Sequence, residues 1–343
     1  MMKSHVRVGM FCLGASLLAG AGVQARAETV TLKVAHFLPA TSNAQVNIIG
    51  PWCEQLKNES KGRLRCQIYP SLQLGGTPAT LADLARNGVA DIVWTAPSYS
   101  TGKFPRVEVL ELPFMLPYGG MAGNRLIWKF YQQYATDDFK PYKVLALFGD
   151  GGQDLHVRTR PIRTLADFKG LKIRAPNRMS SKILDSLGAT PVGMPPAQMT
   201  ESISKGVVDG ALSAWEVVPP TKLDEVTRYH TAIAEGQPAI AYAVLAMLMN
   251  KRKYDHLPAD LKEILDRNSG DALVERFGKA WDAYTAKAKA ATPADRIVPI
   301  APADYAQMER ATGKVVDEWE KSASSRGVDA KKLLEAARQL LPH

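Results

Sequence analysis

The chain has 343 residues, of which 46% are hydrophobic and 22% are charged, and its 22 prolines are spread along it. This composition excludes a small peptide, a disordered chain and a collagen-like or coiled-coil protein, and it predicts a compact protein of one or two domains. The formal charge is +9, but basic and acidic residues are interspersed without a polybasic run, which argues against a nucleic-acid-binding surface.

The N-terminus has the pattern of an export signal. Lys3 and Arg7 precede a mostly apolar stretch over residues 8–23, and Ala25-Arg26-Ala27 supplies small residues where a signal peptidase reads them. We expect cleavage after Ala27, and the alternative is an uncleaved membrane anchor. Cleavage would remove three cations and no acids, which lowers the formal charge from +9 to +6 over the remaining 316 residues.

Export places the two remaining cysteines in an oxidising compartment. Cys53 and Cys66 lie on either side of an expected helix-to-strand turn around Gly62. We expect a disulfide between them, and the alternative is a pair of buried free thiols.

Strands and helices are expected to alternate along the chain. Apolar periodicity and turn residues predict strands over 29–37, 64–69, 91–95, 171–174 and 190–194, with helices between them, one of them over 180–187. This order is typical of an α/β protein with mostly parallel sheets, whose ligands bind at the carboxyl ends of the strands.

An internal repeat divides the chain into two similar halves. Residues 87–96 align without gaps to residues 205–214, and both runs contain Gly-Val, an Asp three residues after the Gly, and a closing Thr-Ala or Ser-Ala. In both runs we expect a helix to end at a left-handed glycine and a buried strand to begin after the Asp. The sequence therefore predicts two α/β lobes.

The last third of the chain is expected to connect and brace these lobes. The apolar run over 239–249 predicts a buried strand that crosses between them. A single helix of about 30 residues is expected from Pro258 to Pro293, long enough to contact both lobes. Two further helices are expected near 303–323 and 329–341.

Several motifs in order resemble the DctP-type substrate-binding proteins of TRAP transporters. The first lobe carries Gly-Gly-Thr-Pro at 75–78 and Glu-Leu-Pro-Phe-Met at 111–115, and the second carries Asp-Phe-Lys-Gly-Leu-Lys-Ile-Arg at 167–174 and Gly-Val-Val-Asp-Gly at 206–210. The resemblance implies a two-lobed periplasmic-binding-protein-like fold, each lobe a mixed, mostly parallel sheet flanked by helices. It also implies a periplasmic protein that captures a small-molecule carboxylate and delivers it to membrane permease subunits.

The resemblance implies the following organisation. Residues 1–27 form the signal peptide, 28–151 with about 240–278 form lobe I, 152–239 with about 279–307 form lobe II, and 308–343 form C-terminal helices that pack on the lobes.

Arg174 is the expected anchor for the ligand. It ends a strand that faces the crevice, its side chain stays charged, and the arginine in the matching Lys-Ile-Arg run binds the ligand carboxylate in the family. The alternative is a structural arginine. Further candidates are Ser213 at the end of the repeated strand, Trp215 as an apolar wall, and Phe37, Trp94 and Thr95 at the rim of lobe I. For Trp215, Phe37, Trp94 and Thr95 the alternative is core packing.

The chain differs at one position from the members of this family that resemble sialic-acid-binding proteins, and this difference indicates which class of ligand to expect. Where those relatives have a second arginine, this chain has Asp154, flanked by Gln153 and His156. We therefore expect a monocarboxylate with an apolar or aromatic body, with His156 placed to bind a hydroxyl or keto group unless it is structural. No cofactor is expected, although Gln153, Trp215 and Glu216 resemble residues that hold a bridging cation in 2-oxo-acid-binding relatives.

The chain is not expected to be an enzyme. Ser202 and Lys205 satisfy Ser-x-x-Lys, but the companion motifs are absent and a solvated helix end explains the pair. The remaining alternatives are a binding protein for an ABC transporter or a signalling receptor, and a secreted enzyme with an unrecognised site.

Overall fold

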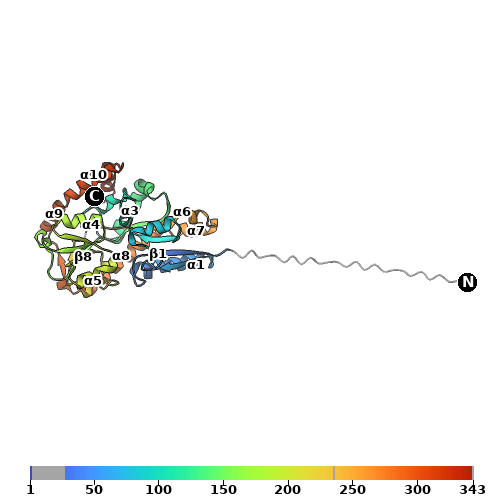
Figure 1. The fold of residues 1–343 in the computed structure, drawn as a ribbon, viewed down its shortest axis with the longest axis horizontal. Helices are drawn as coiled ribbons and strands as arrows, with labels where there is room; N and C mark the ends of the chain where they lie inside the picture. The colour runs from blue at the N-terminus through green and yellow to red at the C-terminus, as the bar shows by residue number, and fades with distance from the viewer. Residues whose placement is uncertain (2–27, 235, 342–343) are drawn as a thin grey trace.

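The structure is a computed structural model that describes residue 1, residues 28–234 and residues 236–341. The export signal expected over residues 1–27 therefore lies, apart from its first residue, outside the described residues. Figure 1 shows two groups of strands and helices, with α8 (Asp271–Ala291) between them. We call the group that contains β1 lobe I and the group that contains β8 lobe II.

Lobe I is built on a five-stranded mixed sheet. Its strands, in spatial order, are β2 (Leu64–Tyr69), β1 (Val30–His36), β3 (Ile92–Thr95), β10 (Val244–Asn250) and β4 (Tyr142–Gly149). The strand β1 runs parallel to both neighbours, whereas β10 runs antiparallel to β3 and β4. The flanking helices are α1 (Gly50–Glu59), α2 (Leu81–Arg86), α3 (Gly120–Phe130), α6 (Lys251–Asp255) and α7 (Ala259–Arg267).

Lobe II is built on a six-stranded mixed sheet. Its strands, in spatial order, are β11 (Ile297–Pro299), β9 (Tyr229–Ala232), β5 (Asp154–Val157), β8 (Gly210–Ser213), β6 (Lys172–Ala175) and β7 (Thr190–Gly193). The helices α4 (Arg178–Ser186) and α5 (Pro196–Ser204) pack on this sheet. The expected fold class, two mixed sheets flanked by helices, is confirmed.

The repeated sequence forms the same structure in both lobes. Gly88 and Gly206 follow α2 and α5 with φ of +77° and +70°, so both end a helix in the left-handed region. The Asp91 carboxylate accepts a hydrogen bond from the backbone N–H of Lys33 at 2.8 Å, and the Asp209 carboxylate accepts one from Lys172 at 2.8 Å. Each Asp therefore ties the start of the repeated strand, β3 or β8, to the neighbouring parallel strand, β1 or β6.

The chain crosses between the lobes in two segments that run side by side. After β4 it passes through residues 150–153 into β5, and it returns through residues 238–243 into β10. The segments pair in antiparallel fashion: Asp150 N–H donates to the Ala243 carbonyl at 3.0 Å, and Gln153 N–H donates to the Ala241 carbonyl at 2.9 Å. The strand expected over 239–249 is therefore shorter than predicted, because only residues 244–250 join a sheet and the residues before them form the crossing.

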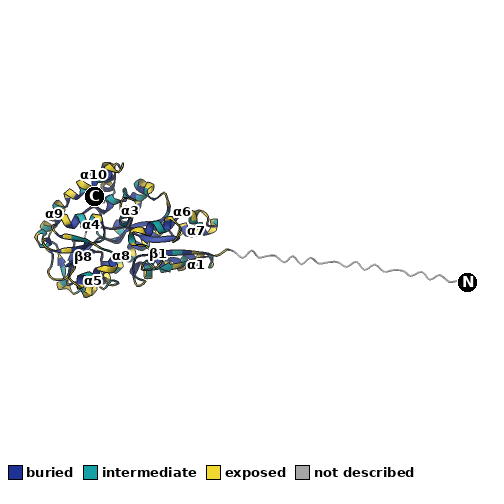
Figure 2. Ribbon diagram, viewed as in Figure 1, coloured by how far each residue is buried: buried dark blue, intermediate teal, exposed yellow. Residues whose placement is uncertain are grey.

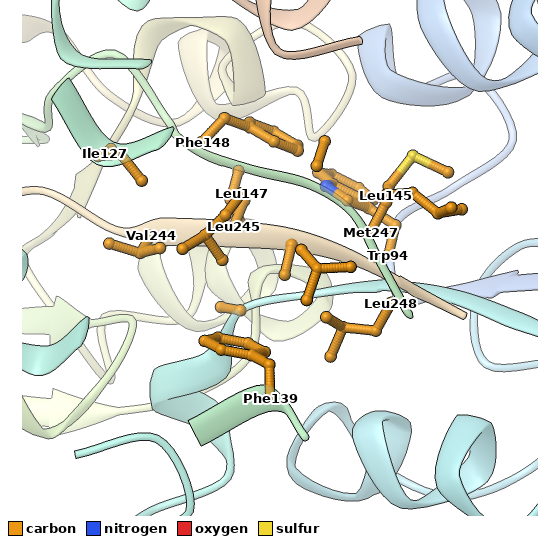
Figure 3. Close-up of a cluster of buried hydrophobic side chains, with 14 of the residues drawn as sticks. Trp94, Ile127, Phe139, Leu145, Leu147, Phe148, Val244, Leu245, Met247 and Leu248 are labelled. Carbon is orange, nitrogen blue, oxygen red and sulfur yellow. The ribbon is translucent and has the colours of Figure 1, made fainter. Parts of the chain in front are cut away.

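The main hydrophobic core surrounds β10 and the edge strand β4 of lobe I. Figure 3 shows apolar side chains on both faces of β4 and β10, with Trp94 of β3 beside them. Figure 2 shows the sheets largely buried, while the exposed residues lie on the outer sides of the helices. Across the described residues, none of the helices is long and apolar enough to cross a membrane.

The prediction of a single long helix between Pro258 and Pro293 is wrong. The structure breaks it into α7 and α8 at residues 268–270, where Gly270 has a φ of +60°. Two contacts hold this break: Trp52 Nε1 donates to the Asn268 carbonyl at 2.8 Å, and Gly270 N–H donates to the Leu145 carbonyl at 2.7 Å. Helix α8 still braces both lobes, since it packs on α3 and β4 and on the turn that follows β8.

The C-terminal residues form three helices, not the two expected. They are α9 (Pro302–Ala311), α10 (Gly313–Ser325) and α11 (Ala330–Gln339). The helix expected over 303–323 is interrupted at Thr312, whose backbone N–H and hydroxyl both bond carbonyls of α9. The expected cysteine pair is bonded in the structure: a disulfide joins Cys53 of α1 to Cys66 of β2.

Candidate ligand-binding site

A cavity between the lobes is lined by residues at the ends of strands from both sheets. We call it the interlobe cavity. Lobe I contributes Phe37, Leu38, Trp94, Tyr99 and Leu245, and lobe II contributes Arg174, Pro176, Pro196, Ser213, Ala214, Glu216 and Val217. The crossing segments contribute Asp150, Gln153 and Ala243. Because each lobe supplies part of the lining, the cavity exists only when the lobes are together.

The lobe I wall is aromatic. Phe37, which follows β1, stacks on Trp94 of β3 with ring centroids 5.0 Å apart and an interplanar angle of 16°. Tyr99, in a short 3₁₀ turn after β3, contacts Phe37 edge to face at 5.5 Å. Strands β1 and β3 are parallel neighbours, so their carboxyl ends bring these rings to the same edge of the sheet. Such a wall suits a flat apolar ligand.

Arg174 of β6 supplies the cation of the cavity. Its Nε donates to the carbonyl of Met194, just after β7, at 3.0 Å, and its Nη1 donates to the carbonyl of Leu212 in β8 at 3.0 Å. Carbonyls from both neighbouring strands therefore fix the guanidinium. The residue is 2% exposed, and Nη2 has no hydrogen-bond partner among the described residues. Burial lowers the pKa of the guanidinium, and nearby Tyr99 and Asp150 offset part of this shift. A buried cation with a free donor is suited to an anion.

Asp150 and Glu216 make part of the same cavity acidic. Asp150 Oδ2 accepts a hydrogen bond from Gln153 Nε2 at 2.7 Å, and its Oδ1 accepts from the backbone N–H groups of Gly152 and Ala243 at 3.1 and 3.2 Å. Burial raises the pKa of Asp150 to about 6. Burial, with a smaller contribution from the Asp150 charge, raises the pKa of Glu216 to about 8.

The structure brings together five of the residues predicted for the site. Phe37, Trp94, Gln153, Arg174 and Ser213 all line the interlobe cavity. Glu216, expected only as a cation ligand, lines it as well.

Trp215 does not line the cavity, so its assignment as an apolar wall is corrected. It is 1% exposed and packs in a cluster with Met199 and Ile203 of α5. Its Nε1 donates to Asp154 Oδ2 at 2.7 Å. The reason is local: a 3₁₀ turn at Trp215–Val217 follows β8, and it places Glu216 and Val217 in the lining while Trp215 packs beneath it.

His156 is also outside the cavity lining. Its Nε2 lies 3.1 Å from the Ser213 carbonyl oxygen, which can only accept, so Nε2 carries the proton and Nδ1 accepts from His230 Nδ1 at 2.8 Å. Burial lowers its pKa to about 3, so the ring is neutral near pH 7. Both ring nitrogens are used within lobe II, and His156 is a structural residue.

Thr95 and Asp154 lie outside the lining too. Successive residues of a strand point to opposite faces, so with Trp94 facing the cavity Thr95 faces away from it, fully buried. Asp154 is held by Trp215 and by the Tyr118 hydroxyl, which donates to Oδ2 at 2.6 Å. The position where relatives carry a second arginine is therefore part of a buried network in this chain.

The sequence reasoning missed nine of the fifteen lining residues, and two of these nine, Tyr99 and Asp150, carry polar side chains. Tyr99 follows Thr95-Ala96-Pro97 at the end of β3, and Asp150 precedes two glycines at the end of the apolar run that forms β4. Both follow the carboxyl end of a strand, where ligands bind in open α/β sheets. Their positions in the sequence therefore indicated that they could line the cavity.

The lobes also touch beside the cavity. The Asn177 side chain, which caps α4 by accepting from Ser180 N–H, reaches across to lobe I. Its Nδ2 donates to Ser98 Oγ at 3.1 Å and to Glu111 Oε2 at 3.3 Å. As for a metal, the described residues contain no cluster of three or more His, Cys, Asp or Glu side chains that could hold one.

Comparisons with known proteins agree with this architecture. Residues 34–322 match the family DctP, bacterial extracellular solute-binding protein family 7. A TRAP solute-binding protein from Rhodoferax ferrireducens, solved with copurified benzoate, is 41% identical with a TM-score of 0.87, over 91% of this chain and 98% of that one. A marine metagenome TRAP solute-binding protein specific for aromatic acid ligands, solved with 3-hydroxybenzoate, is 37% identical with a TM-score of 0.87, over 92% and 98% of the two chains.

A curated relative is more distant. The 2,3-diketo-L-gulonate-binding periplasmic protein YiaO of Escherichia coli is 28% identical over 63% of this chain and 65% of its own length. The motif resemblance, the two-lobed structure and the match over residues 34–322 agree. The chain belongs to the DctP family, family 7 of the bacterial extracellular solute-binding proteins.

Proposed function

We propose that this protein captures a small aromatic monocarboxylate and delivers it to the membrane subunits of a TRAP transporter. The observation that carries the proposal is the buried guanidinium of Arg174, which faces a cavity with an aromatic wall and has a nitrogen without a partner in the described part of the chain. A ligand carboxylate supplies the missing acceptor and the opposite charge. The ring then packs against Phe37, Trp94 and Tyr99.

An acidic side chain of the cavity supports a single carboxylate on the ligand. Asp150, whose pKa is raised only to about 6, lines the same cavity as Arg174, and a second carboxylate placed near its charge would be repelled or would have to take up a proton. This argument for a monocarboxylate replaces the one made from the sequence. That one relied on Asp154, which does not line the cavity. The two relatives solved with benzoate and 3-hydroxybenzoate, at 41% and 37% identity, support the same ligand class.

Binding is coupled to closure of the lobes in this account. Lobe I supplies the aromatic wall and lobe II supplies Arg174, so a ligand that touches both favours the closed form. Asn177 adds direct contacts to Ser98 and Glu111 across the lobes. The closed form is the one that we expect the permease to recognise.

A thermal-shift screen tests the proposed ligand class. Benzoate, 3-hydroxybenzoate and mandelate should raise the melting temperature, because a ligand at one hundred times its Kd stabilises the folded state by about 2.7 kcal/mol. Succinate and malate should leave it unchanged. Stabilisation by the dicarboxylates and not by the aromatic acids would refute the aromatic monocarboxylate assignment.

Three finer parts of the proposal have their own tests. Export with cleavage after Ala27 predicts a periplasmic protein whose intact mass lacks residues 1–27. If the protein delivers its ligand to the permease, deletion of its gene should abolish uptake of the bound acid. The wild-type protein should restore this uptake, and Arg174→Ala should not. A role in binding without catalysis predicts that the ligand is recovered unchanged after prolonged incubation with the protein.

A further inference from the structure

Two hydrogen bonds beside the interlobe cavity join the lobes through one side chain. Asn177 lies in lobe II, between β6 and α4, and its Nδ2 donates to Ser98 Oγ and Glu111 Oε2 of lobe I at 3.1 and 3.3 Å. Asn177 is 9% exposed and Glu111 is 2% exposed. We call these two bonds the Asn177 bridge. It joins atoms of different lobes, so it forms when the lobes close and breaks when they separate.

The Asn177 bridge connects two chain segments that each line the cavity. Asn177 follows Arg174 by three residues, with Pro176 of the lining between them. Ser98 precedes Tyr99, another lining residue, in the 3₁₀ turn after β3. Neither Asn177 nor its two acceptors line the cavity. The bridge therefore acts on closure around the ligand and not on the contacts of the ligand itself.

The lobe I end of the bridge is held in place by β10. Glu111 Oε1 accepts a hydrogen bond from the backbone N–H of Val244, the first residue of that strand, at 2.8 Å. This bond leaves Oε2 for Asn177. When the lobes separate, water replaces the bridge, and a protein–protein hydrogen bond between buried groups has a net advantage over that exchange. The bridge therefore favours the closed form.

Asn177 has a second role that can be separated from the bridge. Its Oδ1 accepts from the backbone N–H of Ser180 at 2.8 Å and so caps the N-terminus of α4. Serine caps helices as well as asparagine does, but it lacks the amide nitrogen that donates across the lobes. The substitution Asn177→Ser therefore keeps the cap and removes the bridge.

We propose that Asn177 is a positioning residue for ligand capture, because the Asn177 bridge stabilises the closed form and thereby slows release of the bound acid. The inference rests on the proposed function, since it concerns closure around the same ligand. Arg174 and the aromatic wall hold the acid inside the cavity, and the bridge determines how long the cavity stays closed. Because the bridge does not touch the ligand, its loss affects different acids by the same factor.

Stopped-flow tryptophan fluorescence of the purified protein with benzoate and with 3-hydroxybenzoate tests the inference. In Asn177→Ser the dissociation rate constant should rise by about fivefold or more, and by the same factor for both acids within about twofold. The association rate constant should stay within about twofold of the wild type, because the acid enters the open form, in which the bridge is absent. A role limited to the helix cap would change neither rate.

Asn250 provides the matched control within lobe I. Its Oδ1 caps α6 by accepting from the Lys253 N–H at 2.8 Å. Its Nδ2 donates to the carbonyls of Ala85 and Arg86 at 2.7 and 3.1 Å, so these bonds do not cross between the lobes. Asn250→Ser loses the same kind of bonds and should lower the melting temperature, while both rate constants stay within about twofold of the wild type.

Ser98→Ala examines the bridge from its other end. It removes one of the two acceptors, so it should raise the dissociation rate constant less than Asn177→Ser does. In the double variant the increase should be smaller than the product of the two single increases, because both substitutions remove the same bond. Ser98→Ala also serves as the second variant if Asn177→Ser fails to fold.

Three outcomes would overturn the inference. They are a dissociation rate constant unchanged in Asn177→Ser, an equal increase in Asn250→Ser, and an increase for one acid only, which would place Asn177 in contact with the ligand. If the wild type binds benzoate and Asn177→Ser releases it at the same rate, only this inference fails. If the wild type binds neither acid, the proposed function fails and this inference fails with it.

Discussion

Arg174 shows how far single residues could be assigned from the sequence. Its position at the end of a strand predicted a residue of the cleft, and the structure places it in the interlobe cavity with its guanidinium held by two carbonyls. Trp215 and His156 were misplaced because residue type does not reveal which side of a turn or strand faces a cavity. The partners that decide their places, Asp154 and His230, come from other strands.

The corrected place of Trp215 predicts a change in stability without a change in binding. Trp215→Phe removes the hydrogen bond to Asp154 and leaves that buried carboxylate with the Tyr118 hydroxyl. The free energy of unfolding should fall by about 1–3 kcal/mol. Urea denaturation measures this fall, and titration with benzoate should give a Kd within about twofold of the wild type. A large loss of affinity would instead return Trp215 to the binding wall.

At the scale of elements, the features that depend on local sequence patterns were predicted well, and the features that depend on long-range contacts were not. The strand over 64–69 and the repeated helix-Gly-Asp-strand unit appear as expected, since apolar alternation and a left-handed glycine act within a few residues. The break between α7 and α8 was missed because contacts from Trp52 and Leu145, distant in sequence, hold it. The same limit explains the shortened β10, whose preceding residues pair with the other crossing segment.

The repeated aspartates predict matched losses of stability in the two lobes. Asp91→Ala and Asp209→Ala each leave a strand N–H, of Lys33 or Lys172, without its acceptor. Each should lower the free energy of unfolding by about 1–3 kcal/mol. Chemical denaturation followed by circular dichroism measures the effect, with the Asp→Asn variants as controls because they retain an acceptor oxygen. Equal stability of the Ala variants and the wild type would show that these bonds do not hold the strands.

Removal of the disulfide should lower the stability of the protein without changing its affinity for the ligand. The disulfide joins α1 to β2 across 13 residues of sequence, and neither cysteine lines the interlobe cavity. Replacing both cysteines by serine should lower the free energy of unfolding by about 2–4 kcal/mol. Thermal denaturation of the double variant measures this fall. The affinity for benzoate should be unchanged, and a parallel loss of affinity would contradict the separation of the disulfide from the site.

The whole molecule should lose stability as the pH rises from about 6.5 to 8. In the ligand-free protein burial raises the pKa of both Glu111 and Glu216 to about 8, from an ordinary value of 4.5. An acid with a raised pKa in the folded state binds more protons there than in the unfolded state, so it stabilises at low pH and loses that contribution as the pH approaches 8. Each group contributes up to about 1.4 kcal/mol per pH unit.

Other titrating groups act mainly outside this window. Burial lowers the pKa of His156 to about 3 and that of His230 to about 4, so these histidines affect stability chiefly below pH 6.5, and with the opposite sign. Melting curves between pH 6.5 and 8 measure the slope. Glu111→Gln should roughly halve it, and a slope that is flat in the wild type, or unchanged in the variant, would contradict the buried neutral carboxyl groups.

The most direct test of the account is a calorimetric titration of benzoate into the wild-type protein and into Arg174→Lys and Arg174→Ala. We expect binding to the wild type, a loss of about 2–4 kcal/mol in Arg174→Ala, and a loss of at least tenfold in Arg174→Lys. The single nitrogen of lysine cannot take the places of the separate guanidinium nitrogens that bond the two carbonyls and face the ligand. Arg310→Lys, an exposed site on α9, is the control. Equal affinity of the wild type and both Arg174 variants would contradict the central claim.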